Sequence, residues 1–301
     1  MKVSVVLTTY NGEKYLCELL DSLRNQTHKP EEVLICDDGS SDGTRKMLVD
    51  YIEKYHLDGW KPIFNSPNKG WKKNFRDGIQ LANNDLIFPC DQDDIWERNK
   101  IEKMSTIMEE NENIQLLSSE YLPIYEAGGQ VVETAEKYDC DLEKIPFDSH
   151  FASGNKPGCV MCIRRGLIER TRNIWEDWYP HDAFLWTMAI FLDGCYVIHE
   201  PLIRYRRHAG NTTNHVTRDK SAVILSLKRN KNLVQWVMSS QESFLDKRKG
   251  KILKDFLVYA NLRLELLEKK KFRNLFKLVK YREFYRTVKQ ELGDFYLSIV
   301  K

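Results

Sequence analysis

Three carboxylates lie within four residues, directly after an apolar run. Asp91, Asp93 and Asp94 follow the segment 86–88, Leu-Ile-Phe. Such a run is typical of a buried strand, so its carboxylates are expected at the rim of a sheet. Carboxylates this close repel one another unless a cation lies among them, and Mg²⁺ or Mn²⁺ binds such oxygen ligands beside phosphate. The cluster predicts a divalent-metal site for a phosphorylated substrate; the alternative is an acidic turn that caps the following helix.

The segments before this cluster alternate between strand, turn and helix. Residues 3–9 and 32–36 have the length and apolar content of buried strands, and a helical apolar spacing follows each of them. The alternation predicts an α/β fold with a Rossmann-like, mostly parallel sheet and helices on both faces. Ligands of such sheets bind beyond the carboxyl ends of the strands. The polar residues at these ends, which should converge on one rim, are Thr9, Tyr10, Asn11, Asp37, Asp38, Asp91, Gln92, Asp93 and Asp94.

Charge divides the chain into two parts. The 301 residues have a net charge of +2, yet residues 218–301 carry 21 Lys and Arg against 9 Asp and Glu. We therefore expect an α/β domain over residues 1–215 and a basic helical segment over 216–301. Within that segment an apolar face is expected from Phe272, Phe276, Val279, Phe284, Val288, Leu292 and Phe295. The segment either packs on the first domain or contacts an anionic membrane surface, and the two readings are compatible.

Cysteine usage and hydropathy indicate the compartment. The seven cysteines are an odd number in mostly apolar contexts, which is typical of reduced thiols. Cys159 and Cys162 form a lone Cys-x-x-Cys pair, for which packing is favoured over a zinc site. The N-terminus lacks the features of a signal peptide, and no stretch reaches the roughly 18 apolar residues of a membrane span. We expect a cytoplasmic protein, either free or peripheral on the inner face of the cell membrane.

Four motifs together resemble the family 2 glycosyltransferases of GT-A fold. They are Val-Val-Leu-Thr-Thr-Tyr-Asn-Gly at 5–12, Cys-Asp-Asp-Gly-Ser-Ser-Asp-Gly-Thr at 36–44, Asn-Lys-Gly at 68–70 and Asp-Gln-Asp-Asp-Ile-Trp at 91–96. The last motif is also similar to bacterial polysaccharide transferases often assigned to rhamnose transfer. The resemblance implies an inverting enzyme that moves one sugar, rhamnose or a hexose, from a dTDP- or UDP-linked donor. The acceptor would be a saccharide, lipid-linked, in the synthesis of a bacterial surface polysaccharide.

The resemblance also assigns residues to the nucleotide. Tyr10 matches the first nucleotide-binding turn, where its ring would stack on the base. Asp38 matches the carboxylate that reads the base, Asp37 holds the turn or reaches the ribose, and Lys73 counters diphosphate charge. Tyr packing under the first helix and Asp capping of the second are the structural alternatives. The full implied set of nucleotide-binding residues is Thr9, Tyr10, Asn11, Asp37, Asp38, Asn68, Lys73, Asp91 and Gln92.

For the reaction itself, the resemblance implies a metal and a base. Mn²⁺ or Mg²⁺ would be held by Asp93 and Asp91, with His208 completing the shell and Asp94 able to share the role. Asp182 matches the catalytic base that takes the proton of the acceptor hydroxyl, with a helix cap as its structural alternative. The residues expected at the diphosphate or the acceptor are His181, Arg206, Arg207 and Trp96. His181 stands where the family more often has Glu, so it orients Asp182 or the acceptor, or replaces Asp182 as base.

Two other function classes remain open at this point. A sugar nucleotidyltransferase would also use a parallel sheet and carboxylates, but it usually carries a Gly-rich basic loop where this chain has Thr8-Thr9-Tyr10-Asn11-Gly12. A non-catalytic carbohydrate- or nucleotide-binding subunit is the second alternative. Nucleic acid is not expected as a partner, because rim carboxylates repel phosphate unless a metal intervenes.

Overall fold

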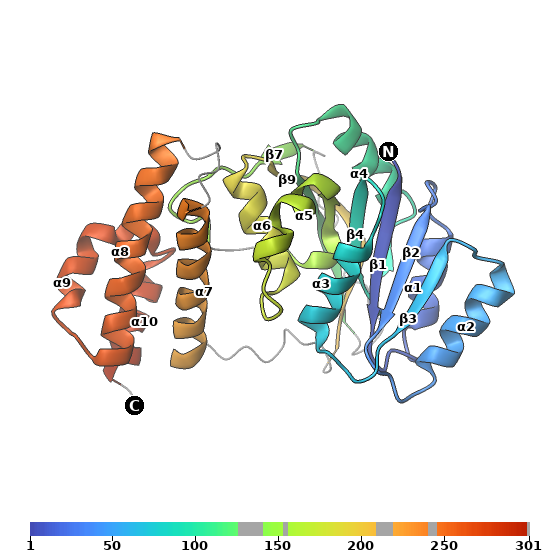
Figure 1. Cartoon of the computed structure of the whole chain (residues 1–301), viewed down its shortest axis with the longest axis horizontal. Coiled ribbons are helices and arrows are strands. Elements are labelled where there is room, and N and C mark those ends of the chain that lie inside the picture. Colours follow the sequence, from blue (N-terminus) through green and yellow to red (C-terminus); the bar gives the residue numbers. More distant parts are fainter. Residues whose placement is uncertain (126–140, 153–155, 209–218, 240–245, 300–301) are drawn as a thin grey trace. The chain divides into compact units, whose positions relative to one another are not determined.

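The computed structural model describes residues 1–125, 141–152, 156–208, 219–239 and 246–299 (Figure 1). The chain divides into two compact units. The first comprises Met1–Ile145 and Asn155–Ala209, and the second comprises Pro146–Gly154 and Gly210–Lys301. The second unit therefore includes a short segment from the middle of the sequence as well as the basic C-terminal part. Cys140 falls outside the described residues.

The first unit is built on one mixed sheet. Among the described residues nine strands pair in the order β3-β2-β1-β4-β8-β6-β9-β5, and β7 pairs with β9. Their bounds are β1 Val3–Thr9, β2 Glu32–Asp37, β3 Trp60–Phe64, β4 Leu86–Asp91, β5 Ile95–Trp96, β6 Leu116–Tyr125, β7 Leu142–Lys144, β8 Met161–Arg164 and β9 Cys195–Arg207. Strands β3, β2, β1 and β4 are parallel, whereas β8 joins β4 antiparallel. The expected α/β fold with a parallel sheet is confirmed for this half.

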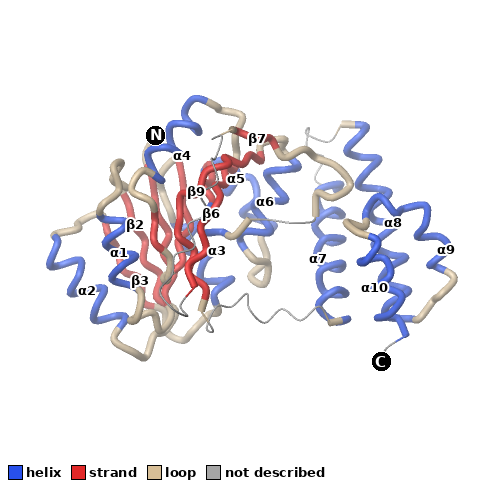
Figure 2. Tube along the Cα trace, turned by 180° about the vertical axis from the view of Figure 1, so that it is seen from behind, coloured by secondary structure: helices blue, strands red, loops and turns tan. Residues whose placement is uncertain are grey.

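Helices cover both faces of the parallel strands, as Figures 1 and 2 show from opposite sides. The helices of this unit are α1 Leu16–Arg24, α2 Thr44–Tyr55, α3 Trp71–Leu81, α4 Lys100–Glu110, α5 Arg165–Thr171 and α6 His181–Phe191. Alternate residues of β1 point to opposite faces. Val5 and Leu7 join a core with apolar residues of α1, α2 and α4. Val6 faces α3, where a Cβ on Gly78 would lie 2.7 Å from its Cγ1, so the glycine lets the helix approach closely.

The register of the parallel strands brings their polar ends together. Thr9 is the Cα partner of Asp37 across β1 and β2, and Thr8 is the partner of Asp91 across β1 and β4. Neighbouring strands lie about 4.8 Å apart, so residues that pair in register are direct neighbours. The carboxyl ends of β1, β2 and β4 therefore form one continuous polar rim.

The second unit is helical. It consists of α7 Lys220–Ser239, α8 Lys247–Lys269, α9 Asn274–Leu278, a 3-10 helix Val279–Phe284 and α10 Val288–Ile299. The mid-chain segment is packed into it through Phe151, whose ring lies 5.0 Å from that of Phe256. The apolar face expected from Phe272 to Phe295 is not continuous, because the helix breaks after Leu278 and Phe284 is buried while the other six side chains are exposed. Within the described parts of the chain, no helix combines the length and apolar content needed to cross a bilayer.

Candidate active site

Asp37 is fixed at the end of β2 by hydrogen bonds. Its buried carboxylate accepts from Thr9 Oγ1 at 3.0 Å, from the Ser40 backbone at 3.1 Å and from Arg45 Nε at 2.6 Å. Burial alone would raise the pKa of Asp37, but the bonds from Ser40 and Arg45 outweigh it and hold the pKa below its ordinary value. Asp37 is thus an ionised group that secures the turn, and the structure gives it no direct opening toward a ribose.

Asp38 binds a neighbouring loop. Only 3% of it is exposed, and its oxygens accept from the backbone N–H groups of Lys69 and Gly70, each at 2.8 Å, and from Asn65 Nδ2 at 3.2 Å. Asn68 lies in the same loop and accepts from the Gly70 backbone at 2.9 Å. The carboxylate therefore positions residues 68–70 next to the first rim motif.

The first turn after β1 presents an exposed ring on a rigid backbone. Tyr10 is 50% exposed, while its backbone N–H donates to Gln92 Oε1 at 2.8 Å and its carbonyl accepts from Gln92 Nε2 at 3.0 Å. Asn11 Oδ1 accepts from the Ser41 backbone at 2.8 Å and ties this turn to the loop after β2. The motifs after β1, β2 and β4 are therefore linked by direct bonds, and the ring of Tyr10 has an open face suited to stacking.

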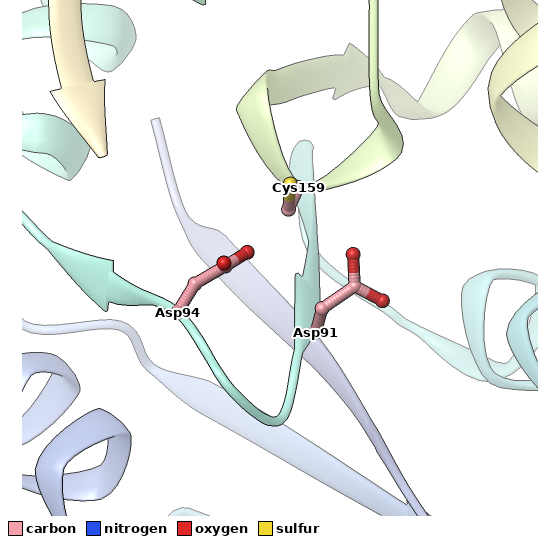
Figure 3. Close-up of side chains that lie close together, drawn as sticks. All are labelled: Asp91, Asp94 and Cys159. Atoms are coloured by element: carbon pink, nitrogen blue, oxygen red, sulfur yellow. The ribbon is translucent and has the colours of Figure 1, made fainter. Parts of the chain in front are cut away.

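The acidic turn after β4 converges on a buried thiol. Ligand atoms of Asp91, Asp94 and Cys159 all lie within 4.8 Å of one another (Figure 3). Asp94 is 1% exposed; its Oδ1 accepts from the Arg206 backbone at 3.0 Å, whereas its Oδ2 has no hydrogen-bond partner among the described residues. Burial and the charge of Asp93 raise the pKa of Asp91 to about 7, and burial and Asp91 raise the pKa of Asp94 well above its ordinary value. Carboxyl groups crowded in this way are stabilised when a proton or a cation lies among them.

Asp93 lies beside the predicted histidine. His208 Nε2 is 2.8 Å from Asp93 Oδ2, and the imidazole stacks on Tyr15 with ring centroids 5.1 Å apart. The structure therefore brings Asp93 and His208, two of the residues expected at the metal, into contact, whereas Asp91 lies with Asp94 and Cys159.

Arg206 and Arg207 are placed differently from the expected diphosphate clamp. Arg206 Nε donates to the Asp93 carbonyl at 2.9 Å, and its guanidinium pairs with Glu18. Arg206 thus fastens the acidic turn to β9. Arg207 lies over the Tyr205 ring, 4.6 Å from the centroid. Two nitrogens of the Arg206 guanidinium are thus engaged within the protein, and the diphosphate clamp stays a prediction for Arg206 and Arg207.

Two further predicted residues lie elsewhere than expected. Trp96 is 3% exposed and packs in the core, with its ring 6.0 Å from Phe88, so it is not an acceptor contact on this surface. An apolar ring next to an acidic turn is here a core residue of β5. Lys73 Nζ pairs with Asp177 at 2.7 Å. Its charge is therefore engaged in an ion pair of the protein.

A buried lysine under the acidic turn was not among the predicted site residues. Lys100 is completely buried, donates through Nζ to the Cys159 carbonyl and lies 3.6 Å from the Trp96 ring centroid. Burial lowers its pKa to about 8, while the negative groups around it, Asp94 among them, oppose this shift. The available signal was helical spacing: Lys100 falls on the stripe of Met104 and Met108, where an apolar residue is expected.

Asp182 and His181, at the start of α6, have different environments. The charge of Asp182 makes a small contribution to the raised pKa of Asp91, after burial and Asp93, although 90 residues separate the two in the sequence. His181 is 4% exposed, its ring stacks on Phe75 at 4.1 Å, and a Cβ on Gly158 would lie 1.9 Å from its Nε2. Burial lowers the pKa of His181 to about 4. His181 is thus a neutral packing residue rather than an exposed base or acceptor contact.

Comparison with known proteins identifies the family. A model described as glycosyl transferase family 2 matches residues 4–163, more than half of the chain. The chain belongs to glycosyl transferase family 2. A protein named dTDP-rhamnosyl transferase RfbG, from Shigella flexneri, is 31% identical over 222 residues, which cover 68% of this chain and 72% of the relative. An uncharacterized glycosyltransferase of Nostoc is 26% identical over 232 residues, which cover 72% of this chain and 67% of that relative. The match therefore spans about two thirds of these relatives.

Solved structures support the fold of this glycosyltransferase. Residues 1–349 of S. aureus TarS, solved in complex with UDP-GlcNAc, superpose with a TM-score of 0.63 at 18% identity over 100% of this chain and 82% of that fragment. The mannosyltransferase PcManGT of Pyrobaculum calidifontis, solved with GDP-Man and Mn²⁺, gives 0.54 at 15% identity over 93% of this chain and 75% of PcManGT. The sequence resemblance and the GT-A fold are confirmed, and the chain is a family 2 glycosyltransferase.

Proposed function

We propose that this glycosyltransferase is an inverting, metal-dependent enzyme that transfers one rhamnose or hexose residue from a dTDP- or UDP-linked donor to a saccharide. The observation that carries the proposal is the crowding of Asp91 and Asp94 at the carboxyl end of β4, in a chain of this family; the charge of Asp182 also acts on Asp91. A donor bound at the rim would have its leaving group near the acidic turn and its reacting sugar toward Asp182. The relative named as a dTDP-rhamnosyl transferase and the neighbour solved with UDP-GlcNAc support the donor class.

The donor set at the acidic turn fits Mn²⁺ or Mg²⁺. Asp91, Asp93 and Asp94 offer carboxylate oxygens, which hard divalent cations prefer, and His208 adds an imidazole beside Asp93. Burial and the charge of Asp93 raise the pKa of Asp91, and a cation bound there would favour the ionised carboxylate. The neighbour solved with Mn²⁺ agrees with such a metal. When bound, the cation supplies positive charge at the diphosphate as it leaves.

The residues of the chain would bind the nucleotide and transfer the proton of the acceptor. The Tyr10 ring stacks on the base, and the backbone held by Asp37, Asp38 and Gln92 shapes the nucleotide site. Asp182 takes the proton of the acceptor hydroxyl as that oxygen bonds to the anomeric carbon and the bond to the diphosphate breaks. Attack from the face opposite the leaving group inverts the anomeric centre.

The proposed acceptor is a lipid-linked saccharide of a bacterial surface polysaccharide. This places the enzyme in the cytoplasm, peripheral on the inner face of the cell membrane. The excess of Lys and Arg in residues 218–301 supports that location, because basic surfaces are attracted to anionic lipids.

The test separates binding from chemistry. Purified protein is offered dTDP-rhamnose and UDP-hexoses with and without Mn²⁺, and both donor binding and release of nucleoside diphosphate are measured. We expect Asp182→Asn to bind donor with unchanged affinity and to lose turnover about 10²- to 10⁴-fold, the usual contribution of a general base. Near-normal turnover of this variant would refute the base assignment, and pyrophosphate release from a nucleoside triphosphate would refute the reaction class.

A further inference from the structure

Helix α10 has its apolar side chains on the outside. Val288, Leu292, Phe295, Tyr296 and Ile299 recur at the spacing i, i+4, i+7, i+8 and i+11, which places them on one face of a helix. Their exposed fractions are 62%, 64%, 46%, 65% and 53% in that order. A surface helix normally buries such a face against the core. We call these five residues the outer face of α10.

The opposite side of α10 is held inward by buried charge. Asp294 is 2% exposed and accepts from Arg263 Nη2 of α8 at 2.7 Å and from Tyr285 Oη at 2.9 Å. Arg263 is itself only 4% exposed, and Ser298 is fully buried on the same side. Rotating the helix to bury its apolar side would leave Arg263 and Asp294 without each other in a dry environment, which is strongly unfavourable. The outward direction of the apolar face is therefore specified by the sequence.

Basic residues flank α10 in the sequence and outnumber the acidic ones. Residues 269–299 contain nine Lys and Arg and three acidic residues. Two of the acidic residues are committed to ion pairs, Asp294 with Arg263 and Glu291 with Arg282. Exposed basic residues before and within α10 include Lys277, Lys280, Arg286 and Lys289.

We propose that the outer face of α10 inserts into the headgroup region of a membrane that contains anionic lipid. An apolar helix face with aromatic residues and flanking Lys and Arg has the chemistry of an interfacial helix. A second copy of the chain fits less well, because packing this face on itself would bring the same basic residues together. This proposal rests on the proposed function and names the surface that would contact the membrane. Its test uses neither donor nor acceptor. Failure to bind vesicles can therefore be distinguished from failure to transfer sugar.

The first experiment uses the full-length, unmodified chain. Its binding to vesicles of phosphatidylcholine alone is compared with binding to vesicles that also contain phosphatidylglycerol, by flotation at low and high salt. We expect binding to the anionic vesicles only, weakened by salt because surface charges are screened. Equal binding to both vesicle types, or no binding to either, would overturn the proposal.

The second experiment locates the contact. The double substitution Leu292→Ser with Tyr296→Ser should weaken binding to anionic vesicles by at least about tenfold, since each apolar side chain contributes through its buried area. Leu225→Ser is the matched control, because Leu225 is 59% exposed on α7 of the same unit. Lys289→Gln should weaken binding about fivefold, the factor that corresponds to about 1 kcal/mol for one basic residue near the surface, whereas Lys251→Gln on α8 should not.

Two outcomes decide against the assignment even when binding is seen. If the Leu292 and Tyr296 variant unfolds at the wild-type temperature yet binds vesicles as well as wild type, another surface makes the contact. If the wild-type chain sediments as a dimer that these substitutions dissociate, the outer face of α10 is a self-interface. Because both substituted side chains are exposed, the thermal unfolding midpoint should stay close to that of wild type, and the wild-type vesicle comparison does not depend on any variant.

Discussion

Two pairs of carboxylates at the same rim have opposite surroundings. Asp37 and Asp38, after β2, accept bonds from backbone N–H groups, a hydroxyl, an amide and a guanidinium. Asp91 and Asp94, after β4, lie beside each other, and one oxygen of Asp94 has no hydrogen-bond partner within the described residues. The pKa of Asp37 is lowered, whereas the pKa values of Asp91 and Asp94 are raised. Asp37 and the two carboxyl groups of Asp91 and Asp94, at the ends of parallel strands of one sheet, thus have pKa values shifted in opposite directions.

The difference in surroundings distinguishes carboxylates that stabilise the fold from carboxylates that are available to a ligand. A carboxylate whose oxygens are satisfied by its own protein stabilises the loops that it binds, and its charge is already compensated. A crowded cluster has a free-energy cost that a ligand can remove, and such perturbed groups concentrate at functional sites. Lys100 supplies one positive charge near Asp91 and Asp94, yet the pKa values of both carboxyl groups remain raised. We therefore assign Asp37 and Asp38 to the architecture of the nucleotide site and the cluster after β4 to cation binding.

The largest expected effect is on cation affinity. Asp93→Ala should weaken Mn²⁺ binding by several kcal/mol, on the order of a thousandfold, because the cation loses a charged ligand. Titration of Mn²⁺ followed by electron paramagnetic resonance measures this directly. Asp37→Asn is the control variant, and its Mn²⁺ affinity should stay near that of wild type. Equal losses in both variants would show that the two carboxylate pairs act as one site.

A smaller effect is expected on stability when Asp38 is changed. Asp38→Ala removes the acceptor of the Lys69 and Gly70 backbone N–H groups and should lower the free energy of unfolding by about 3 kcal/mol. Urea unfolding measures the change, and Asp58→Ala, at an exposed position, is the control that should have little effect. Unchanged stability together with altered preference among nucleotide bases would instead support the base-reading role that the family resemblance implies.

Much of this rim could be predicted from the sequence because it depends on local patterns. Strand periodicity and the position of polar residues after β1, β2 and β4 place Thr9, Asp37 and Asp91 at parallel carboxyl ends before any coordinates are known. The hydrogen-bond partners that rim residues find in distant loops could not be predicted in this way. Asp38 is bound by a loop some 30 residues away, as its bonds to Lys69 and Gly70 show, and such long-range pairings depend on how loops pack.

Burial and pairing of individual side chains are what the sequence motifs leave unspecified at this site. Trp96, Arg206 and His181 have side chains suited to ligand recognition, and sequence motifs cannot tell whether such a side chain faces solvent or the core. The structure uses Trp96 as a core ring, Arg206 as a tether of the acidic turn and His181 as a packed neutral ring. Lys100 differs from these residues because it is a charged side chain that is completely buried. Its position on an apolar helix stripe indicates burial, which composition alone does not reveal.

The smallest expected effect is on the pH dependence of the free energy of unfolding. It involves the buried imidazole of His181, a base, in place of a carboxyl group. Burial lowers the pKa of His181 from 6.5 to about 4, so between these values the unfolded chain binds a proton that the folded chain does not. The stability that neutral His181 contributes is therefore complete above pH 6.5 and is lost as the pH falls toward 4. Between pH 7 and pH 5 this loss should be about 2 kcal/mol.

His181→Phe keeps the stacked ring on Phe75 and removes the titrating nitrogens, so its free energy of unfolding should fall less between pH 7 and pH 5. Urea unfolding at both pH values gives the slope of each protein, and the comparison of slopes remains valid if the variant is less stable at pH 7. His56→Asn, at an exposed position with a left-handed backbone that Asn tolerates, should retain the wild-type slope. If wild type and His181→Phe lost stability equally on acidification, His181 would titrate as an accessible histidine, and its role as an acceptor contact would regain support.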